Sequence, residues 1–405
     1  MVANQTLERA ATNLTEWQNV PLLDIVAFQN GKPHEQDVDK YGRYKLITLD
    51  SIGIDGVLKK EHKRTQVADD LLKQGDIVCV LSDIAHGRLL GLSDVIPEDD
   101  VYVLNQRMGR LRVTRSANPQ YIRLQINRQQ EHFRKRGQGT SQRHIYERDF
   151  AALQIPLPEL VEQNAIVHAL SDADAYIESL KQLLSKKRAV MQGAMQELLT
   201  GKRRLRGFNK AWTTAKLSQL AEIRSGGTPS TAIAMYWDGG IPWCTPTDIT
   251  NLTGHKYISE TSETISKQGL ASSSAEMIPA GSVLMTSRAT IGECAINVVP
   301  CTTNQGFKNF VPKAIDSEFL YYLLQSLKSE FISLCGGSTF LEIGKAQLTQ
   351  FEICYPSMSE EQKTIATILS DMDAGIIELE AKLEKARNIK QGMAQELLTG
   401  KIRLI

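Results

Sequence analysis

The sequence repeats itself, and the repeat limits the folds that this chain can adopt. Residues Ser171–Lys202 and Ser370–Lys401 match without a gap at 18 of 32 positions, at an offset of 199 residues. The match includes the unbroken run Gln196–Lys202. Identity of this length marks an internal duplication, so we expect the chain to contain two copies of one architecture.

Fainter similarities extend the repeat toward the N-terminal side of each half. The matched pairs are Trp17 with Trp212, Asn105-Gln106 with Asn304-Gln305, and Gly139-Thr140-Ser141 with Gly337-Ser338-Thr339. The order along the chain is therefore globular part, helix, globular part, helix. Because the globular parts have diverged further than the helices, we expect the same architecture to carry two different surfaces.

Apolar residues follow a heptad in both duplicated segments. Positions spaced alternately by four and three residues are apolar at nine of ten places in each segment. A 3.5-residue repeat of this length requires a helical partner. We predict that the two helices pair with each other; the alternative is that each packs only on its own domain. The residues predicted at the helix interface are Ile166, Leu170, Ile177, Leu180, Leu184, Met191, Ile365, Leu369, Ile376, Leu379, Leu383 and Met393.

The globular halves combine both kinds of secondary structure. Segments rich in β-branched and aromatic residues predict strands at 44–49, 77–81, 101–104, 283–286 and 307–311, and helices are predicted at 119–130 and 317–334. The fold class is α+β: two repeated mixed α/β globular domains joined by two long helices that form an antiparallel coiled coil. The predicted boundaries are an N-terminal extension (1–15), a first domain (16–158), a central helix and linker (159–208), a second domain (209–356) and a C-terminal helix (357–405).

Length and composition narrow the class of protein. A chain of 405 residues suits two or three domains, and 42% hydrophobic with 23% charged residues is ordinary for a globular protein. No apolar run is long enough for a membrane span, and the N-terminus lacks the pattern of a secretory signal, so we expect a cytoplasmic protein. The six cysteines are scattered without a C-x-x-C pair, which argues against a disulfide framework or a zinc ribbon.

Positive charge is concentrated in one stretch of the first half. Residues 101–148 contain eleven Lys and Arg, ten of them Arg, against two Glu, a net charge of +9 over 48 residues. Residues 134–143 read as a glycine-punctuated loop that is dense in hydrogen-bond donors. Such a loop can follow a phosphate backbone while Gln and Arg reach base edges; the alternative is a solvated basic face. Residues 210–350 carry ten Lys and Arg against eleven Asp and Glu, so the second half has far fewer cations to offer.

Motifs of catalysis are missing. The sequence has no Asn/Asp-Pro-Pro-Tyr/Phe run, no convincing G-x-G-x-x-G and no P-loop, and its seven His are dispersed. Neither a methyltransferase nor a nucleotide site is supported, and no metal site is expected. We therefore interpret the chain as non-catalytic.

Several motifs together resemble one known family. The helices begin with E-Q-x-x-I and L-S-D-x-D-A and end with Q-E-L-L-T-G-K, twice. The second half adds the segments 225–230, 236–239, 241–243, 247–249 and 287–292 together with Asn304-Gln305 and 337–339. This set, which spans nearly the whole chain, resembles the specificity (S) subunits of type I restriction–modification enzymes. The first half departs from the pattern, since 29–33 matches 226–229 only loosely and the Tyr-Trp and Pro-Trp pairs are absent.

The resemblance implies two target-recognition domains, each reading one half of a bipartite double-stranded DNA sequence. The paired helices would set the spacing and dock methyltransferase subunits, which use S-adenosylmethionine, while restriction subunits supply ATP- and Mg-dependent translocation and cleavage. This chain itself would bind no cofactor. The positions that we predict to contact DNA are Arg107, Arg134, Lys135, Arg136, Gln138, Thr140, Ser141, Gln142 and Arg143 in the first domain, and Thr228, Arg288, Asn304, Gln305, Ser338, Thr339 and Lys345 in the second.

A second interpretation comes from another class of protein. A coiled-coil scaffold with two protein-binding lobes and no DNA specificity would share the heptads and the duplication. The Arg-rich stretch separates the two hypotheses, because a scaffold has no use for such a local excess of positive charge and its binding would not fall steeply with salt.

Overall fold

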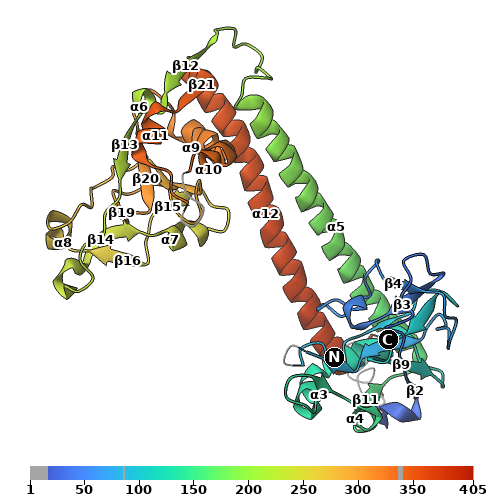
Figure 1. The fold of residues 1–405 in the computed structure, drawn as a ribbon. Helices are drawn as coiled ribbons and strands as arrows, with labels where there is room; N and C mark the ends of the chain where they lie inside the picture. The colour runs from blue at the N-terminus through green and yellow to red at the C-terminus, as the bar shows by residue number, and fades with distance from the viewer. Residues whose placement is uncertain (1–16, 85–86, 336–340, 405) are drawn as a thin grey trace, which may run out of the picture. The chain divides into compact units, whose positions relative to one another are not determined.

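Two long helices stand out in the computed structural model, which describes residues 17–84, 87–335 and 341–404 (Figure 1). Helix α5 is Leu160–Leu198 and helix α12 is Ser359–Leu397, each of 39 residues. Beyond them, Gly201 and Gly400 adopt φ of +70° and +74°, the left-handed conformation that glycine supplies after a helix end. The predicted N-terminal extension, 1–15, lies outside the described residues.

Backbone contacts divide the chain into two units that do not follow the linear order. Unit 1 is Met1–Ile177 with Lys385–Ile405, and unit 2 is Glu178–Glu384. Each unit therefore combines one globular part with segments of both long helices. The linear boundaries expected from the sequence stay a prediction, since the contacts group residues by packing and not by chain order.

The long helices pack antiparallel within each unit. In unit 1, Ile166 and Leu170 near the start of α5 share a hydrophobic cluster with Leu397 at the end of α12, and Lys390 Nζ lies 2.5 Å from Asp174 Oδ1. In unit 2, the start of α12 shares a cluster with the end of α5, through Ile365 and Leu369 against Met191 and Leu198, and Arg188 forms an ion pair with Glu380. The predicted antiparallel coiled coil is confirmed.

The ends of the long helices also pack on the globular parts, so the packing that the alternative interpretation expected is present as well. Tyr121 and Ile122 join the same cluster as Ile166, and Tyr322 joins that of Leu369. Of the residues predicted at the helix interface, Ile376 and Met393 are partly buried and the other ten are buried.

The globular part of unit 1 is built on two sheets. One has the order β2-β9-β5-β7 and the other β4-β3-β8, in which β3 and β8 run parallel. Strand β1 (Gln18–Pro21) pairs antiparallel with β11 (Gln154–Leu157), directly before α5. The remaining elements are η1 (Leu22–Asp24), β2 (Val26–Asn30), β3 (Tyr44–Ile47), η2 (Leu49–Ser51), β4 (Lys63–Thr65), β5 (Ile77–Val80), β6 (Ser82–Asp83), β7 (Ser93–Val95), β8 (Tyr102–Leu104), β9 (Met108–Val113), α2 (Pro119–Arg128), α3 (Gln130–Arg136), β10 (Arg143–His144) and α4 (Glu147–Ala151).

The globular part of unit 2 repeats this strand order and adds a fifth strand, β15, to its larger sheet. Its sheets have the orders β13-β20-β17-β18-β15 and β16-β14-β19, with two parallel pairs, β14 with β19 and β15 with β18. Strands β12 (Trp212–Lys216) and β21 (Glu352–Pro356) pair beside the start of α12 (Figure 1). The other elements are α6 (Leu217–Leu220), β13 (Ala221–Ser225), η3 (Ala234–Tyr236), β14 (Trp237–Cys244), α7 (Pro246–Thr250), β15 (Tyr257–Ile258), β16 (Glu263–Ile265), α8 (Lys267–Ala271), β17 (Val283–Thr286), β18 (Cys294–Asn297), β19 (Thr302–Thr303), β20 (Phe307–Pro312), α9 (Ser317–Ser326), α10 (Lys328–Leu334) and α11 (Lys345–Gln350).

Every strand predicted in the globular parts is present within two residues of its expected bounds, and the first predicted helix is α2. The second predicted helix, 317–334, is divided at Leu327 into α9 and α10. The apolar pattern continues across this break because Phe319 and Phe331 are both buried in the same cluster. Within the described residues, no helix is long and apolar enough to cross a membrane.

A glutamate at the start of each long helix ties the chain together in the same way. Glu162 accepts hydrogen bonds from Trp17 Nε1 at 3.1 Å and from both Arg403 Nε and Nη2 at 2.7 Å. Glu361, its repeat equivalent, accepts from Trp212 Nε1 at 3.3 Å and from Arg204 Nε at 2.8 Å. The E-Q motif therefore joins the tryptophan at the start of a globular part to the segment that follows the other long helix.

The next residue of the motif holds the short helix that packs against each long one. Gln163 Oε1 accepts from the Asn118 backbone N–H at 2.9 Å, and Gln362 Oε1 accepts from that of Asp316 at 2.7 Å. Asn118 and Asp316 are the N-caps of α2 and α9, so each Gln anchors a helix start that is itself capped. The repeated motif is thus explained by packing.

We expect Glu162→Gln to destabilise unit 1 by about 3 kcal/mol at pH 7, because it removes one partner of a buried ion pair. The side chains of Glu162 and Arg403 are 8% and 18% exposed. Although desolvation acts in the opposite direction, hydrogen bonds from Arg403, Trp17 and the Leu404 N–H lower the pKa of Glu162. Its contribution is therefore present above about pH 4.5 and lost as the pH falls through the lowered pKa.

Denaturant unfolding of the wild type and the variant at pH 7 and at pH 3 measures this effect. The difference between the two proteins should shrink at pH 3. The matched control is Glu197→Gln, which breaks the exposed pair with Arg203 and should cost about 0.5 kcal/mol or less. A constant difference between wild type and E162Q at both pH values would contradict the role assigned to this ion pair.

Candidate DNA interface

In unit 1, two backbone hydrogen bonds at the end of β5 bring the segments predicted to contact DNA together. We call this arrangement the backbone frame. The Leu81 N–H, just after β5, donates to the Arg107 carbonyl oxygen at 3.0 Å, and the Ile145 N–H donates to the Leu81 carbonyl oxygen at 2.9 Å. The turn at 105–107 and the hairpin at 138–144 therefore lie on either side of the same strand end. Arg107 and the 138–143 residues, 31 positions apart in the sequence, become neighbours.

Unit 2 contains the same frame. The Ser287 N–H donates to the Gly306 carbonyl oxygen at 2.7 Å, and the Ile343 N–H donates to the Ser287 carbonyl oxygen at 3.1 Å. The turn at 304–306 and the segment that begins at Leu341 thus flank the end of β17. Asn304, Gln305 and Arg288 are brought to one edge of the domain.

A glycine in each half packs directly against this turn. A Cβ added to Gly31 would lie 2.1 Å from the Asn105 carbonyl oxygen, and one added to Gly226 would lie 1.9 Å from that of Asn304. Only glycine allows such close approach. The loose sequence match between 29–33 and 226–229 therefore reflects a shared structural requirement.

The two tryptophans of unit 2 support the loop at residues 226–230, which we call the glycine loop. Trp243 Nε1 donates to the Gly227 carbonyl oxygen at 2.9 Å, and Trp237 Nε1 donates to that of Ser230 at 3.2 Å. Their rings meet edge to face with centroids 4.9 Å apart, and Trp243 is 6% exposed. Trp243 is thus a core residue that positions the loop, and it is not available to stack on a base.

The prediction of a loop over residues 134–143 is wrong for its first three positions. Arg134, Lys135 and Arg136 form the last turn of helix α3. Positive charge in a last turn is favourable because the helix dipole is negative there, and all three are good helix formers. The three side chains are exposed, and Lys135 Nζ lies 2.6 Å from Glu131 Oε1 one turn earlier.

The rest of the basic run is a tight hairpin. Gln138 and His144 exchange backbone hydrogen bonds of 3.0 and 2.8 Å, with Gly139 at φ +114°. Thr140 and Ser141 are exposed at its tip, Gln142 Nε2 donates to Ser82 Oγ at 2.7 Å, and Arg143 Nη1 donates to the Arg134 carbonyl oxygen at 3.2 Å. These contacts join the hairpin to the end of α3.

Part of the positive charge counted in the sequence is neutralised internally. Arg112 forms two 2.6 Å hydrogen bonds to the buried Asp76, and Arg123 Nε lies 3.1 Å from Asp94 Oδ1. The charge available to a ligand on unit 1 is therefore smaller than the +9 of the sequence, and it is concentrated at α3 and the hairpin.

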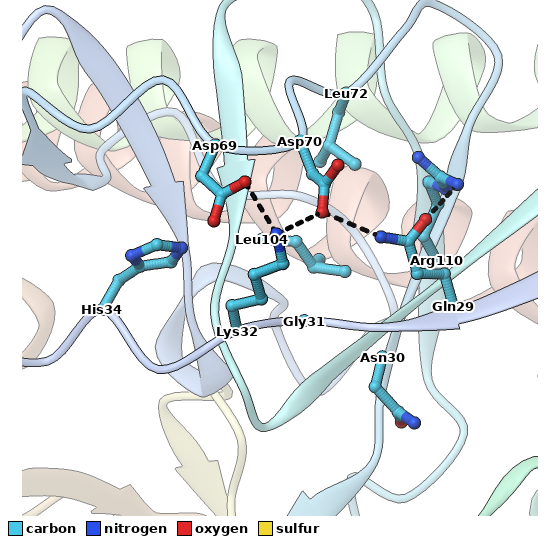
Figure 2. Close-up of a pocket in the computed structure, with 10 residues that line it drawn as sticks. All are labelled: Gln29, Asn30, Gly31, Lys32, His34, Asp69, Asp70, Leu72, Leu104 and Arg110. Atoms are coloured by element: carbon cyan, nitrogen blue, oxygen red, sulfur yellow. Dashed lines mark hydrogen bonds and ion pairs between the residues drawn. The ribbon is translucent and has the colours of Figure 1, made fainter.

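A pocket of unit 1 lined by Gly31, Lys32, Asp69, Asp70 and Arg110 shows the same neutralisation. Figure 2 shows Lys32 between Asp69 and Asp70, with Nζ–Oδ distances of 2.7 and 3.0 Å, and Gln29 between Asp70 and Arg110. Hydrogen bonds to the two carboxylates raise the pKa of Lys32. This lysine is therefore paired within the domain, although its side chain is half exposed.

The cations of unit 2 have acidic partners too. Arg288 Nε lies 2.9 Å from Glu342 Oε2, and the buried Lys308 Nζ lies 3.7 Å from Glu342 Oε1. Burial lowers the pKa of Lys308. Thr228 donates a hydrogen bond to Gln305 Oε1, and Lys345 is the first residue of α11. Ser338 and Thr339, also predicted to contact DNA, lie outside the described residues.

Two clusters of polar residues, built on one repeated frame, thus occupy the equivalent edge of each unit. The sequence matches the family model of the type I restriction modification DNA specificity domain twice, over residues 15–186 and 209–387. These matches cover well over half of the chain. The chain belongs to this family.

Similar proteins come from the same family. The type I restriction enzyme MjaIX specificity subunit of Methanocaldococcus jannaschii is 42% identical over 191 residues, which are 46% of this chain and 43% of that protein. The MjaVIII specificity subunit of the same organism is 25% identical over 412 residues, covering 96% of this chain and 93% of that protein. The chain thus spans less than half of the first relative and nearly all of the second.

A solved structure agrees on the fold. The crystal structure of the type I restriction–modification S subunit from M. genitalium superposes with a TM-score of 0.58 at 16% identity, over 95% of this chain and 97% of that one. The resemblance stated from the sequence is confirmed. As a member of this family, the chain is a specificity component of a restriction system and not a catalytic subunit.

The described residues of this chain offer few reactive groups. No group of three or more His, Cys, Asp or Glu that could hold a metal ion is found among them. Burial raises the pKa of the Cys79, Cys244 and Cys294 thiols, and that of Cys301 to about 11. These thiols are protonated at neutral pH and make poor nucleophiles.

The structure places further polar residues beside the positions that the sequence predicted to contact DNA. Asn105, Gln106 and Glu35 lie at the turn of unit 1, and Ser82 contacts the hairpin through Gln142. The 199-residue offset that pairs Asn105-Gln106 with Asn304-Gln305 was the available signal for the first two. Glu35 has no such repeat signal, and only the fold brings it to the turn.

Proposed function

We propose that this chain reads a bipartite double-stranded DNA sequence as the specificity subunit of a type I restriction–modification complex. Each globular part reads one half-site. The paired helices set the distance between the half-sites and dock methyltransferase subunits, and restriction and translocase subunits join the same complex in the cytoplasm. S-adenosylmethionine, ATP and Mg²⁺ act in those partner subunits, and this chain binds none of them.

The observation that carries the proposal is the repeated frame with different side chains. The turns at 105–107 and 304–306 occupy the same backbone position in the two units, yet their surroundings differ in charge and hydrogen-bonding groups. A duplicated frame with divergent polar groups is what two independent base-reading surfaces require. The scaffold alternative does not explain the exposed cations at α3.

We expect the triple variant Arg134→Gln, Lys135→Gln, Arg136→Gln to weaken binding to every DNA sequence alike. Each lost phosphate contact lowers the slope of log K against log salt by about 0.9, so the slope should fall by roughly two to three. Fluorescence anisotropy with labelled duplexes between about 50 and 200 mM salt measures it.

The matched control neutralises Lys59, Lys60 and Lys63, which are exposed cations of the same domain, and should leave the slope close to that of the wild type. An unchanged slope in the α3 variant would mean that this basic turn faces solvent in the complex. Wild-type binding without salt dependence would favour the protein-binding scaffold over the proposed function.

A further inference from the structure

We propose that Glu35 and Gln106 form a base-reading pair in the first globular part, and that this pair selects a base carrying an exocyclic amino group, adenine or cytosine. The inference rests on the proposed function and adds the specificity of one position to it. It assigns a residue, Glu35, that neither the charge pattern nor the repeat singles out.

The pair is built on a fixed support. Asn105, 5% exposed, accepts hydrogen bonds at its Oδ1 from the backbone N–H of His34 at 3.2 Å and of Gln106 at 2.8 Å. Its Nδ2 donates to Glu35 Oε1 at 3.2 Å. Gly31 lies directly behind the Asn105 carbonyl. The buried amide thus holds both partners of the reading pair in place.

The two reading side chains are exposed and contact each other. Gln106 Nε2 donates to Glu35 Oε1 at 2.8 Å. Both side chains reach solvent at the edge where the Arg107 turn and the hairpin meet. The pair lies on a turn between basic segments. In a DNA complex, this position would bring the pair to base edges in a groove, while the basic side chains on either side contact the phosphates.

The ionised carboxylate of Glu35 determines which end of the Gln106 amide faces it. Desolvation acts in the other direction, but hydrogen bonds from Gln106, from the Glu35 N–H and from Asn105, with the charge of Arg107, lower the pKa of Glu35. An ionised carboxylate accepts only, so the amide nitrogen of Gln106 must face it. The Gln106 carbonyl oxygen is then the end of the amide that is not used in the contact with Glu35, and it can accept a hydrogen bond from a ligand.

An acceptor-rich pair discriminates between bases by charge and hydrogen bonding. The amino groups of adenine N6 and cytosine N4 donate in the major groove and match a carboxylate or an amide oxygen. Guanine O6 and thymine O4 are acceptors and would meet these oxygens with repulsion. The positive charge of Lys32 offsets little of this repulsion because Lys32 is already paired with Asp69 and Asp70 (Figure 2).

The glutamine at the matching turn of the second globular part has a different hydrogen-bond partner. There Thr228 donates its hydroxyl hydrogen to Gln305 Oε1, so the amide nitrogen of Gln305 is the group left to donate outward. The two half-sites should therefore differ in the kind of base edge that the matched glutamines read. The acidic reader belongs to the first domain.

The test is a binding selection with the full-length chain, in complex with its modification subunits, on duplexes randomised across the site. Glu35→Gln keeps the shape but supplies donors as well as acceptors. At one position of the first half-site, we expect the preference for adenine or cytosine over guanine or thymine to fall by about ten- to a hundredfold. The sequence selected by the wild type states which of the two amino-bearing bases is read.

Two further variants make the result specific. Gln106→Ala should relax the same position, and Thr228→Val should affect only the other half-site. Thermal unfolding checks that each variant is folded. If folded E35Q and Q106A select the same first half-site as the wild type with equal discrimination, the reading pair is wrong. If the wild type selects no sequence at all, the proposed function itself has failed.

Discussion

Replacing residues 16–158 with the equivalent segment of a relative that has a different specificity is expected to change one half of the recognised DNA sequence and to leave the other half intact. Because each mismatched base pair costs about 1–3 kcal/mol, binding to the parental site should fall by about a thousandfold or more. Methylation or binding assays on a library of paired half-sites measure both halves at once.

The structure says which residues such a graft must keep. Trp17 donates to Glu162, Asn118 donates through its backbone to Gln163, and Gln125 Nε2 donates to the Leu398 carbonyl oxygen at 2.8 Å. A graft that retains these three residues preserves the anchorage of the domain on the helix ends. The reciprocal graft of residues 209–356 is the control and should change only the other half. If both halves change together in either graft, the two parts do not read DNA independently.

Lengthening the paired helices by one heptad is expected to abolish tight binding at the parental spacing. We would insert seven residues after Leu184 in α5 and seven after Glu380 in α12, on the same side of the Arg188–Glu380 ion pair. The apolar stripes stay in phase, and the pair lengthens by about 10 Å. That length equals about 3 base pairs, and it also turns the second half-site by about 100° around the DNA axis.

The affinity at the parental gap should fall by about a hundredfold or more, because one half-site is lost from register. Selection against both half-sites separated by every gap from short to long shows whether a longer gap restores binding. A protein with the insertion in α5 alone is the control, since its two stripes lose their register and its stability should fall. A double-insertion protein that keeps the parental gap preference at parental affinity would show that the helices do not set the spacing.

Local sequence patterns were sufficient for much of the fold. The duplication and the heptads predicted two long antiparallel helices, because an apolar stripe of that length is well buried against a partner helix. Runs of β-branched and aromatic residues located the strands, and Gly201 and Gly400 marked the helix ends. The heptads and the strand segments are patterns of residues that are close in the sequence, so they survive folding. Tertiary structure altered this part of the prediction mainly by dividing the predicted helix 317–334 at Leu327.

The candidate site was less accessible to such patterns. The charge count identified the stretch that contains Arg134 and Arg143, but it did not separate free cations from those that bond to Asp76 or Asp94. The sequence pattern also predicted a loop where the last turn of α3 lies. Whether a charge is available depends on which carboxylate the fold places beside it, and those partners are 29–36 residues away in the sequence.

The sequence by itself determined the duplication, the helical pairing and the absence of a known catalytic motif, because these follow from identity, periodicity and residue type along the chain. Only the tertiary structure decided that Arg403 bonds to Glu162, 241 residues away, and that Glu35 meets Gln106 at a turn supported by Asn105. Such contacts depend on where the chain returns in space. A hydrogen bond between distant residues leaves no periodic trace, so it emerges only when the whole fold brings donor and acceptor together.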